Sequence, residues 1–201
     1  MQQQKHPLSI VSICAPHDLS SLEQWEAHLR PLEQAGHLAV WSERHLLAGA
    51  SRQEQIDEHL EQANLLVLLL SADFFTDDDC IALMEQAIHH YQNNSLRVLP
   101  LLLRPVAWQE SPLKGFACLP SNGIPITQWS NQDEAWQVCV QGIKRLLGRR
   151  LSRPLPTGPA GKHADPDWER MLRRPRRAYK ELLDQSLHGI AWVELGLANP
   201  T

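Results

Sequence analysis

A dense group of carboxylates lies between residues 71 and 91. Asp73 is followed by the run Asp77 to Asp79, and Glu85 comes six residues later within a stretch whose apolar spacing predicts a helix. Carboxylates at a helix N-terminus satisfy free N–H groups and complement the helix dipole, which gives the three consecutive aspartates a structural role. Glu85 lies beyond that first turn, so it is either an acid available for chemistry or a solvated helix residue.

Other motifs of enzyme chemistry are missing from the sequence. It contains no P-loop, no dinucleotide-binding glycine motif after the first apolar run and no nucleophile elbow. His89 and His90 are adjacent on the predicted helix and point about 100° apart, which does not suit a shared metal ion. The sequence therefore predicts no metal site.

The four cysteines are Cys14, Cys80, Cys118 and Cys139. They have neither CxxC spacing nor a histidine partner at zinc-ligand spacing. The N-terminal apolar run is too short for a signal peptide or a membrane span. We therefore expect free thiols in a cytoplasmic protein that does not enter a membrane.

Strands and helices alternate in the first 147 residues. The predicted strands cover residues 8–15, 38–41, 64–71, 96–103 and 123–127. The first and third are apolar on both alternating faces, which is typical of strands buried inside a parallel sheet. Pro100 indicates an edge or a bulge in the fourth strand. This pattern predicts an α/β fold with a doubly wound parallel sheet covered by helices on both faces.

Helix starts are marked by polar residues before the apolar repeats. Ser20 with Glu23, and Ser51 with Glu54, have the spacing of capping boxes. Asn131 precedes the last repeat and is expected to cap its helix. These signals place helices between the predicted strands and after the last one.

The chain divides into three parts by composition. Up to Leu147 it carries 9 Lys and Arg against 17 Asp and Glu, a formal charge of −8, whereas residues 148–201 carry 10 against 6, a charge of +4. Residues 148–166 are rich in Pro and Gly, as linkers are. We therefore expect a domain over residues 7–147, a linker over 148–166 and a basic helical C-terminal extension over 167–201.

The extension has two distinct features. Residues 170–180 hold five arginines and a lysine, which could contact nucleic acid or could pair with the acidic body of the same or a neighbouring chain; the second is favoured. Helical apolar spacing resumes at Leu182, Leu183, Leu187, Ile190 and Val193. Because so short a segment cannot easily bury its own core, it is expected to dock on the main domain, pair with a copy of itself or lead into a further partner.

Several motifs in order resemble those of a known family. They are W-x-E-R-x-L-x-x-G from Trp41 to Gly49, S-x-D-F from Ser71 to Phe74 with Cys80 following, and L-R-P-V-x-W from Leu103 to Trp108. Over about residues 7–147 the sequence resembles a bacterial TIR (Toll/interleukin-1 receptor) domain. A receiver domain of two-component signalling shares the architecture, but only Asp18 and Asp73 approach the acids it needs.

The resemblance implies a flavodoxin-like fold with a five-stranded parallel sheet. It also implies two activities. Many TIR domains act by associating with one another, as homo-oligomers or filaments. They do so through the loop after the second strand, which here consists of Ser42, Glu43, Arg44, His45, Leu46, Leu47, Ala48 and Gly49. Others, once assembled, cleave the nicotinamide–ribose bond of NAD+, where a carboxylate stabilises the positive charge that develops on the ribose.

If this chain cleaves NAD+, the resemblance implies Glu85 as the catalytic carboxylate and NAD+ as a substrate rather than a cofactor. The implied nucleotide pocket consists of Ala15, Pro16, His17, Asp18, Trp41, Arg44, Ser71, Asp73 and Met84.

Two departures from the family pattern affect the enzymatic hypothesis. The usual catalytic glutamate stands four residues after the position of Cys80, where this chain has Met84, and Glu85 is one residue late. One helix residue is about 100° of rotation, which puts Glu85 beside the apolar stripe rather than in it. Ile13 and Cys14 also replace the usual Ser-Tyr pair. We therefore expect a TIR signalling module of a bacterial defence or regulatory system that acts by self-association, with NAD+ hydrolysis as the alternative.

Overall fold

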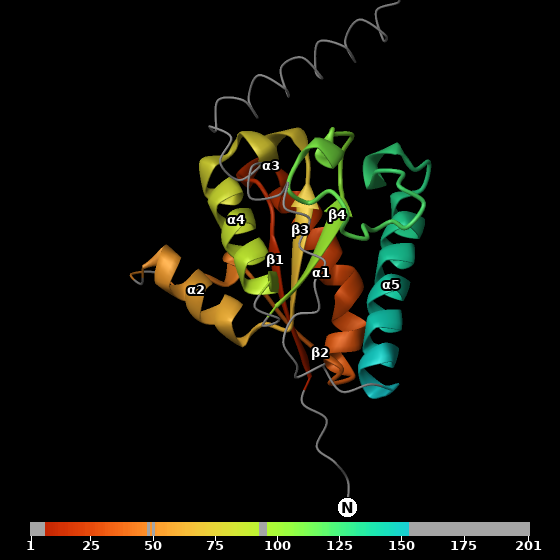
Figure 1. Cartoon of the computed structure of the whole chain (residues 1–201). Coiled ribbons are helices and arrows are strands. Elements are labelled where there is room, and N and C mark those ends of the chain that lie inside the picture. Colours follow the sequence, from red (N-terminus) through yellow and green to blue (C-terminus); the bar gives the residue numbers. More distant parts are fainter. Residues whose placement is uncertain (1–6, 48, 50, 93–95, 153–201) are drawn as a thin grey trace, which may run out of the picture.

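The computed structural model describes residues 7–47, 49, 51–92 and 96–152 (Figure 1). The strands are β1 (Leu8–Ile13), β2 (Leu38–Ser42), β3 (Leu65–Leu70) and β4 (Arg97–Leu102). The α-helices are α1 (Leu19–Gln34), α2 (Arg52–Gln62), α3 (Ala72–Thr76), α4 (Asp78–Gln92) and α5 (Gln132–Ser152). Short 3-10 helices are η1 (Pro16–Asp18), η2 (Glu43–His45), η3 (Trp108–Glu110) and η4 (Ile126–Gln128).

The strands form one parallel sheet in the order β2-β1-β3-β4. Ile10 of β1 lies opposite Leu65 of β3, which in turn lies opposite Arg97 of β4. All six residues of β3 are buried, as expected for a strand covered by helices on both sides. The parallel α/β sheet predicted from the apolar runs is therefore confirmed.

Two apolar layers enclose the sheet. On one face, Val11, Leu66 and Leu68 pack with residues of α2 and α4 such as Ile56 and Leu83. On the other face, the core cluster contains Ile10, Leu65, Val67, Leu22, Trp25, Leu29, Trp136, Cys139 and Ile143, the last six from α1 and α5. Figure 1 shows α2 and α4 on one side of the strands and α1 and α5 on the other.

A fifth strand is not present in the part of the chain that the structure describes, and the predicted strand at 123–127 is wrong. Its last two residues belong to η4 instead. The place beside β4 is taken by Leu119, whose N–H donates to Pro100 O at 2.9 Å and whose carbonyl accepts from Leu102 N at 2.7 Å. This pairing is an isolated bridge between Leu101 and Leu119.

The predicted helix starts have different outcomes. Ser51 and Asn131 are N-terminal caps, since they accept hydrogen bonds from Glu54 N at 3.4 Å and Asp133 N at 3.1 Å. The capping box at Ser20 is wrong, because η1 runs directly into α1.

The aspartates that precede α4 have the structural role predicted for them. Asp77 accepts a hydrogen bond from Cys80 N at 2.8 Å, and Asp78 and Asp79 lie in the first turn of the helix.

The last helix continues past the predicted domain boundary. α5 ends at Ser152, so the first residues of the predicted linker are helical. The remainder of that linker, the basic stretch 170–180 and the apolar repeat after it lie outside the described residues. Within the described residues, no helix has the length and apolarity needed to cross a membrane.

Candidate functional site

Polar side chains from three loops meet at the carboxyl ends of β1, β3 and β4. The carboxylate of Asp18, which is 4% exposed, accepts hydrogen bonds from Ser71 Oγ at 2.5 Å and from Arg104 Nη2 at 2.8 Å. Arg104 also donates to the carboxylate of Asp73. Ligands of open parallel sheets bind at this edge, so this cluster is a candidate ligand-binding site.

Local structure explains how these groups meet. Ser71 ends β3 and caps α3, accepting a hydrogen bond from Phe74 N at 3.1 Å, which leaves its own hydroxyl proton for Asp18. Asp18 ends η1 and makes no side-chain cap bond to α1, because its carboxylate is directed to Ser71 and Arg104.

The two carboxylates fix the charge of Arg104. Burial opposes the charge of its guanidinium, but the hydrogen bonds and charges of Asp73 and Asp18 outweigh that effect and raise its pKa. The cluster therefore ties three loops together, and its cation is already engaged by protein acids.

The loop after β2 has a firmly held root. The hydroxyl of Ser42, a buried residue, donates to Glu26 Oε1 at 2.6 Å, and Ser42 N donates to His45 Nδ1 at 3.2 Å. Arg44 forms ion pairs of 3.0 Å with both Glu23 and Glu26 of α1. The loop therefore begins from a backbone that α1 holds in place.

The tip of the same loop presents an apolar side chain. Gln55 of α2 accepts a hydrogen bond from Leu47 N at 3.0 Å and donates one to Leu47 O at 3.4 Å. The side chain of Leu47 is nevertheless 71% exposed, more than any other large hydrophobic residue among those described. Gly49 follows with a φ of 87°, a left-handed conformation that favours glycine. The backbone of Leu47 is therefore held by Gln55 while its side chain is exposed to solvent.

Trp41, at the end of β2, is engaged by its own fold. Its indole ring stacks on His59 of α2 with the ring centroids 4.2 Å apart and an interplanar angle of 22°. It also packs against the buried cluster between the sheet and α2 and α4. One face of the indole is therefore already occupied by a protein side chain.

Cys14, just after β1, and Cys80, in the first turn of α4, are in contact. Cys80 Sγ lies 3.5 Å from Cys14 O and both residues are buried. Burial, and secondarily the charge of Asp18, raises the pKa of Cys14 to about 12, and burial also raises the pKa of Cys80. A thiol with so high a pKa is protonated at neutral pH and is a poor nucleophile, so these cysteines are core residues.

Comparison with known proteins decides the family. The family described as "TIR domain" matches residues 22–140, more than half of the chain. The chain belongs to the TIR domain family. The Arg104 cluster and the loop after β2 are therefore parts of a TIR domain.

Two individual proteins that match the chain share less than a third of their residues with it in the aligned regions. The chain is 31% identical over 128 residues to "Uncharacterized protein y4lF" of Sinorhizobium fredii (strain NBRC 101917 / NGR234); the match covers 63% of this chain and 40% of that protein. It thus spans well under half of that relative's length. The crystal structure of the TIR domain of the Toll-related receptor TRR-2 from Hydra magnipapillata superposes with a TM-score of 0.43 and 19% identity, covering 73% of this chain and 96% of that one.

Within this TIR domain, Glu85 lies on a flank of α4 about 100° from the side that contacts α2. Gln86 marks the α2 side, because its Nε2 donates to Asp57 Oδ1 at 2.8 Å. Glu85 is about 100° from Gln86, and the exposed residues Ala82 and His89 lie between the two on the outer face of the helix. The Glu85 side chain, which is half-buried, therefore lies on a different flank of α4 from the one that Gln86 uses to contact α2.

Met84 stands at the position where the sequence resemblance implied a glutamate in an NAD+-cleaving domain. It is 2% exposed and packs in the core cluster with Cys80, Leu83 and Ala87. A carboxylate at this position would be buried among apolar side chains, whereas methionine fills the space.

The predicted nucleotide pocket is only partly assembled. Asp18 lies with Ser71 and Asp73 in one cluster, and the buried Ala15 and exposed Pro16 and His17 belong to the turn just before Asp18. Trp41 and Arg44 instead contact α2 and α1. Of the predicted assembly loop, Ala48 lies outside the described residues.

Arg104 was not among the residues predicted for the site, although it stands in the motif L-R-P-V-x-W. Its partners lie 86 and 31 residues away in the chain, so no local spacing reveals the pairing. Glu26 and Gln55, which hold the loop after β2, were also not predicted, because neither belongs to a motif that pointed to the site. Among the residues that the structure describes, no group of three or more His, Cys, Asp or Glu could hold a metal ion.

Proposed function

We propose that this TIR domain is a signalling module that acts by associating with other TIR domains, in the first place with copies of itself, through the loop at 42–51. Its setting would be a bacterial defence or regulatory system. The observation that carries the proposal is the exposed side chain of Leu47 on a backbone held at both its N–H and its carbonyl by Gln55.

The physical argument rests on preorganisation. An apolar side chain that is 71% exposed gains free energy when a partner covers it, about 1.5–3 kcal/mol for a fully buried leucine. Because Gln55 and the Ser42, Arg44 and Glu26 contacts already fix the loop, little backbone entropy is lost on docking. The loop is therefore suited to be inserted into a neighbouring copy.

The site offers less support for NAD+ cleavage. Glu85 lies about 100° around α4 from Gln86, the residue that contacts α2, and Met84 is buried. The cations Arg44 and Arg104 are both paired with carboxylates, which would compete with a pyrophosphate for these two side chains. Association without catalysis is thus the function we propose.

Sedimentation equilibrium of the full chain over a wide range of concentrations tests this function. We expect the apparent mass to rise above the 22.8 kDa of one chain as the concentration increases. A mass that stays at that of one chain at every concentration, with no binding to any other TIR domain, would overturn the proposal.

A further inference from the structure

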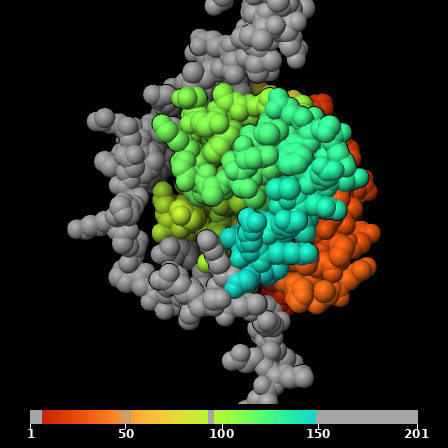
Figure 2. Space-filling model, turned by 90° about the vertical axis from the view of Figure 1, so that its right-hand side faces the viewer, coloured from red at the N-terminus to blue at the C-terminus, as the bar shows by residue number. Residues whose placement is uncertain are grey.

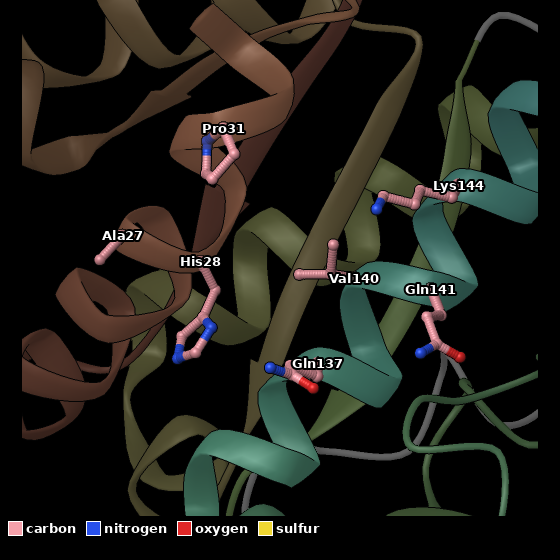
Figure 3. Close-up of a pocket in the computed structure, with 7 residues that line it drawn as sticks. All are labelled: Ala27, His28, Pro31, Gln137, Val140, Gln141 and Lys144. Carbon is pink, nitrogen blue, oxygen red and sulfur yellow. The ribbon is translucent and has the colours of Figure 1, made fainter. Parts of the chain in front are cut away.

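A groove of about 350 Å³ runs between α1 and α5, on the side of the domain away from α2 and α4. Ala27, His28 and Pro31 of α1 line one wall, and Gln137, Val140, Gln141 and Lys144 of α5 line the other (Figure 3). In Figure 2 the blue-green surface of α5 lies beside the orange surface of α1 on this face. The groove belongs to neither the loop after β2 nor the Arg104 cluster.

The groove combines apolar surface with polar groups. Val140 is half-buried over the core cluster, and Leu32, Leu146 and Leu147 continue a partly buried apolar seam between the two helices. Pro31 has no N–H, so the carbonyl of Ala27 on the same wall lacks its usual helical donor. Such a surface suits an apolar segment that also brings hydrogen-bond donors.

Lys144 gives the lining of the groove a positive charge. Lys144 is exposed on one wall, and none of the seven lining residues is acidic. On the other wall, His28 stacks against Trp136 and its Nε2 lies 3.3 Å from the carboxylate of Asp133, which is 81% exposed. An occupant with acidic and apolar residues and no cation of its own fits this field.

The chain carries a segment of this chemistry after α5. Residues 181–201 hold the apolar repeat that begins at Leu182, together with the acids Glu181, Asp184 and Glu194, and contain no lysine or arginine. The preceding stretch 170–180 is strongly basic and would be repelled by Lys144. Of the two halves of the extension, only the last one matches the groove.

The connection is long enough. Twenty-eight residues lie between Ser152 and Glu181. A flexible chain of that length has an end-to-end distance of about 30 Å. Lys144 is eight residues before the end of α5, or about 12 Å along the helix axis. A tether of this kind gives an effective concentration in the millimolar range, so even a weak contact is well populated.

We propose that residues 181–201 of this chain dock in the groove between α1 and α5, with their acids toward Lys144 and their apolar residues over Val140. This docking is independent of the association through Leu47. It holds the end of the chain on the face of the domain opposite to α2 and α4.

Photo-crosslinking of the full chain tests the occupant. A benzophenone amino acid is placed at position 141 in the groove, with the same replacement at the exposed Gln109 as a matched control. We expect position 141, and not 109, to crosslink to peptides from 181–201 of the same chain. Crosslinks between isotopically distinct copies would show that a second copy occupies the groove, and they would overturn the proposal, as would the absence of any crosslink to 181–201.

Charge reversal tests the recognition. Hydrogen exchange in residues 181–201 of the full chain is compared between the parent, Lys144→Glu and the control Lys114→Glu, whose lysine is exposed outside the groove. With a local dissociation constant of about 0.1 mM, exchange in the docked parent is slowed about tenfold. We expect Lys144→Glu to remove that protection, and the added changes Glu181→Lys, Asp184→Lys and Glu194→Lys to restore it. Equal exchange in all variants would contradict the proposal.

Discussion

Arg104, just after β4, donates a hydrogen bond of 2.8 Å to the carboxylate of Asp18, which is 4% exposed and lies 86 residues earlier in the chain. The same guanidinium reaches Asp73 at the start of α3. Three loops at the carboxyl edge of the sheet are thus held by one side chain.

Replacing this arginine should destabilise the domain. In Arg104→Met the buried carboxylate of Asp18 loses its cation and keeps the hydrogen bond from Ser71, so we expect a loss of about 2–3 kcal/mol in the free energy of unfolding. Urea denaturation measures it. The control is Arg97→Met, at an exposed position in β4, which should cost less than about 0.5 kcal/mol. Equal losses in the two variants would contradict the role assigned to Arg104.

Two serines with similar sequence signals should behave differently on mutation. Ser51→Ala removes the cap that accepts from Glu54 N, and we expect a loss of about 1 kcal/mol in the free energy of unfolding. Ser20→Ala should change stability by less than about 0.5 kcal/mol, because Ser20 is exposed within α1 and is not its cap. Thermal and urea unfolding of both variants check the pair, and a larger loss at Ser20 than at Ser51 would contradict the start of α1 at Leu19.

The buried thiols predict a loss of stability at alkaline pH. Burial raises the pKa of Cys139 from 9.0 to about 12, so between these values the thiol ionises in the unfolded chain and stays protonated in the folded one. The folded state then binds more protons, and stability falls as pH rises above 9. From pH 8 to pH 10 this thiol should account for a loss of stability on the order of 1 kcal/mol.

Comparison with Cys139→Ala isolates that contribution, because the other titrating groups are common to both proteins. Although the variant is less stable at every pH through lost packing, its decline between pH 8 and pH 10 should be smaller by the stated amount. Parallel declines in parent and variant would mean that the thiol ionises as readily in the folded chain.

The position of Glu85 makes a prediction about NAD+. Since Glu85 lies about 100° around α4 from the side that contacts α2 and Met84 is buried, we expect no release of nicotinamide from NAD+ by the assembled protein. Chromatography of reaction mixtures under crowding conditions measures it, with Glu85→Gln as the comparison. Release that disappears in Glu85→Gln would establish the catalytic role that the geometry does not favour.

Much of the fold was predictable because its signals are local. The six apolar residues of β3 predicted a strand buried on both faces, and Asn131 marked the start of α5. The strand expected at 123–127 failed because a short apolar run does not reveal whether it will find a partner, and Leu119 already occupies the edge of β4. At Ser20 the local capping pattern failed because α1 begins earlier, at Leu19, directly after Asp18. The position of Asp18 is fixed by contacts with Ser71 and Arg104, which are distant in the sequence.

The site was less predictable than the fold. Sequence motifs brought attention to Ser42, Arg44, Ser71 and Asp73, all of which take part in the loop contacts. They did not show that Arg44 faces α1, since ion pairs between distant segments leave no periodic trace in a sequence. The exposure of Leu47 likewise depends on a side chain of α2 that fixes its backbone.

Self-association through the loop after β2 is tested most directly by sedimentation of Leu47→Ala beside Ile124→Ala, an exposed hydrophobic residue remote from that loop. We expect Leu47→Ala to weaken association roughly 10- to 100-fold, as the loss of a leucine buried at an interface would, with unchanged thermal unfolding of the monomer. Ile124→Ala should associate like the parent. Association of Leu47→Ala at the strength of the parent would contradict the account.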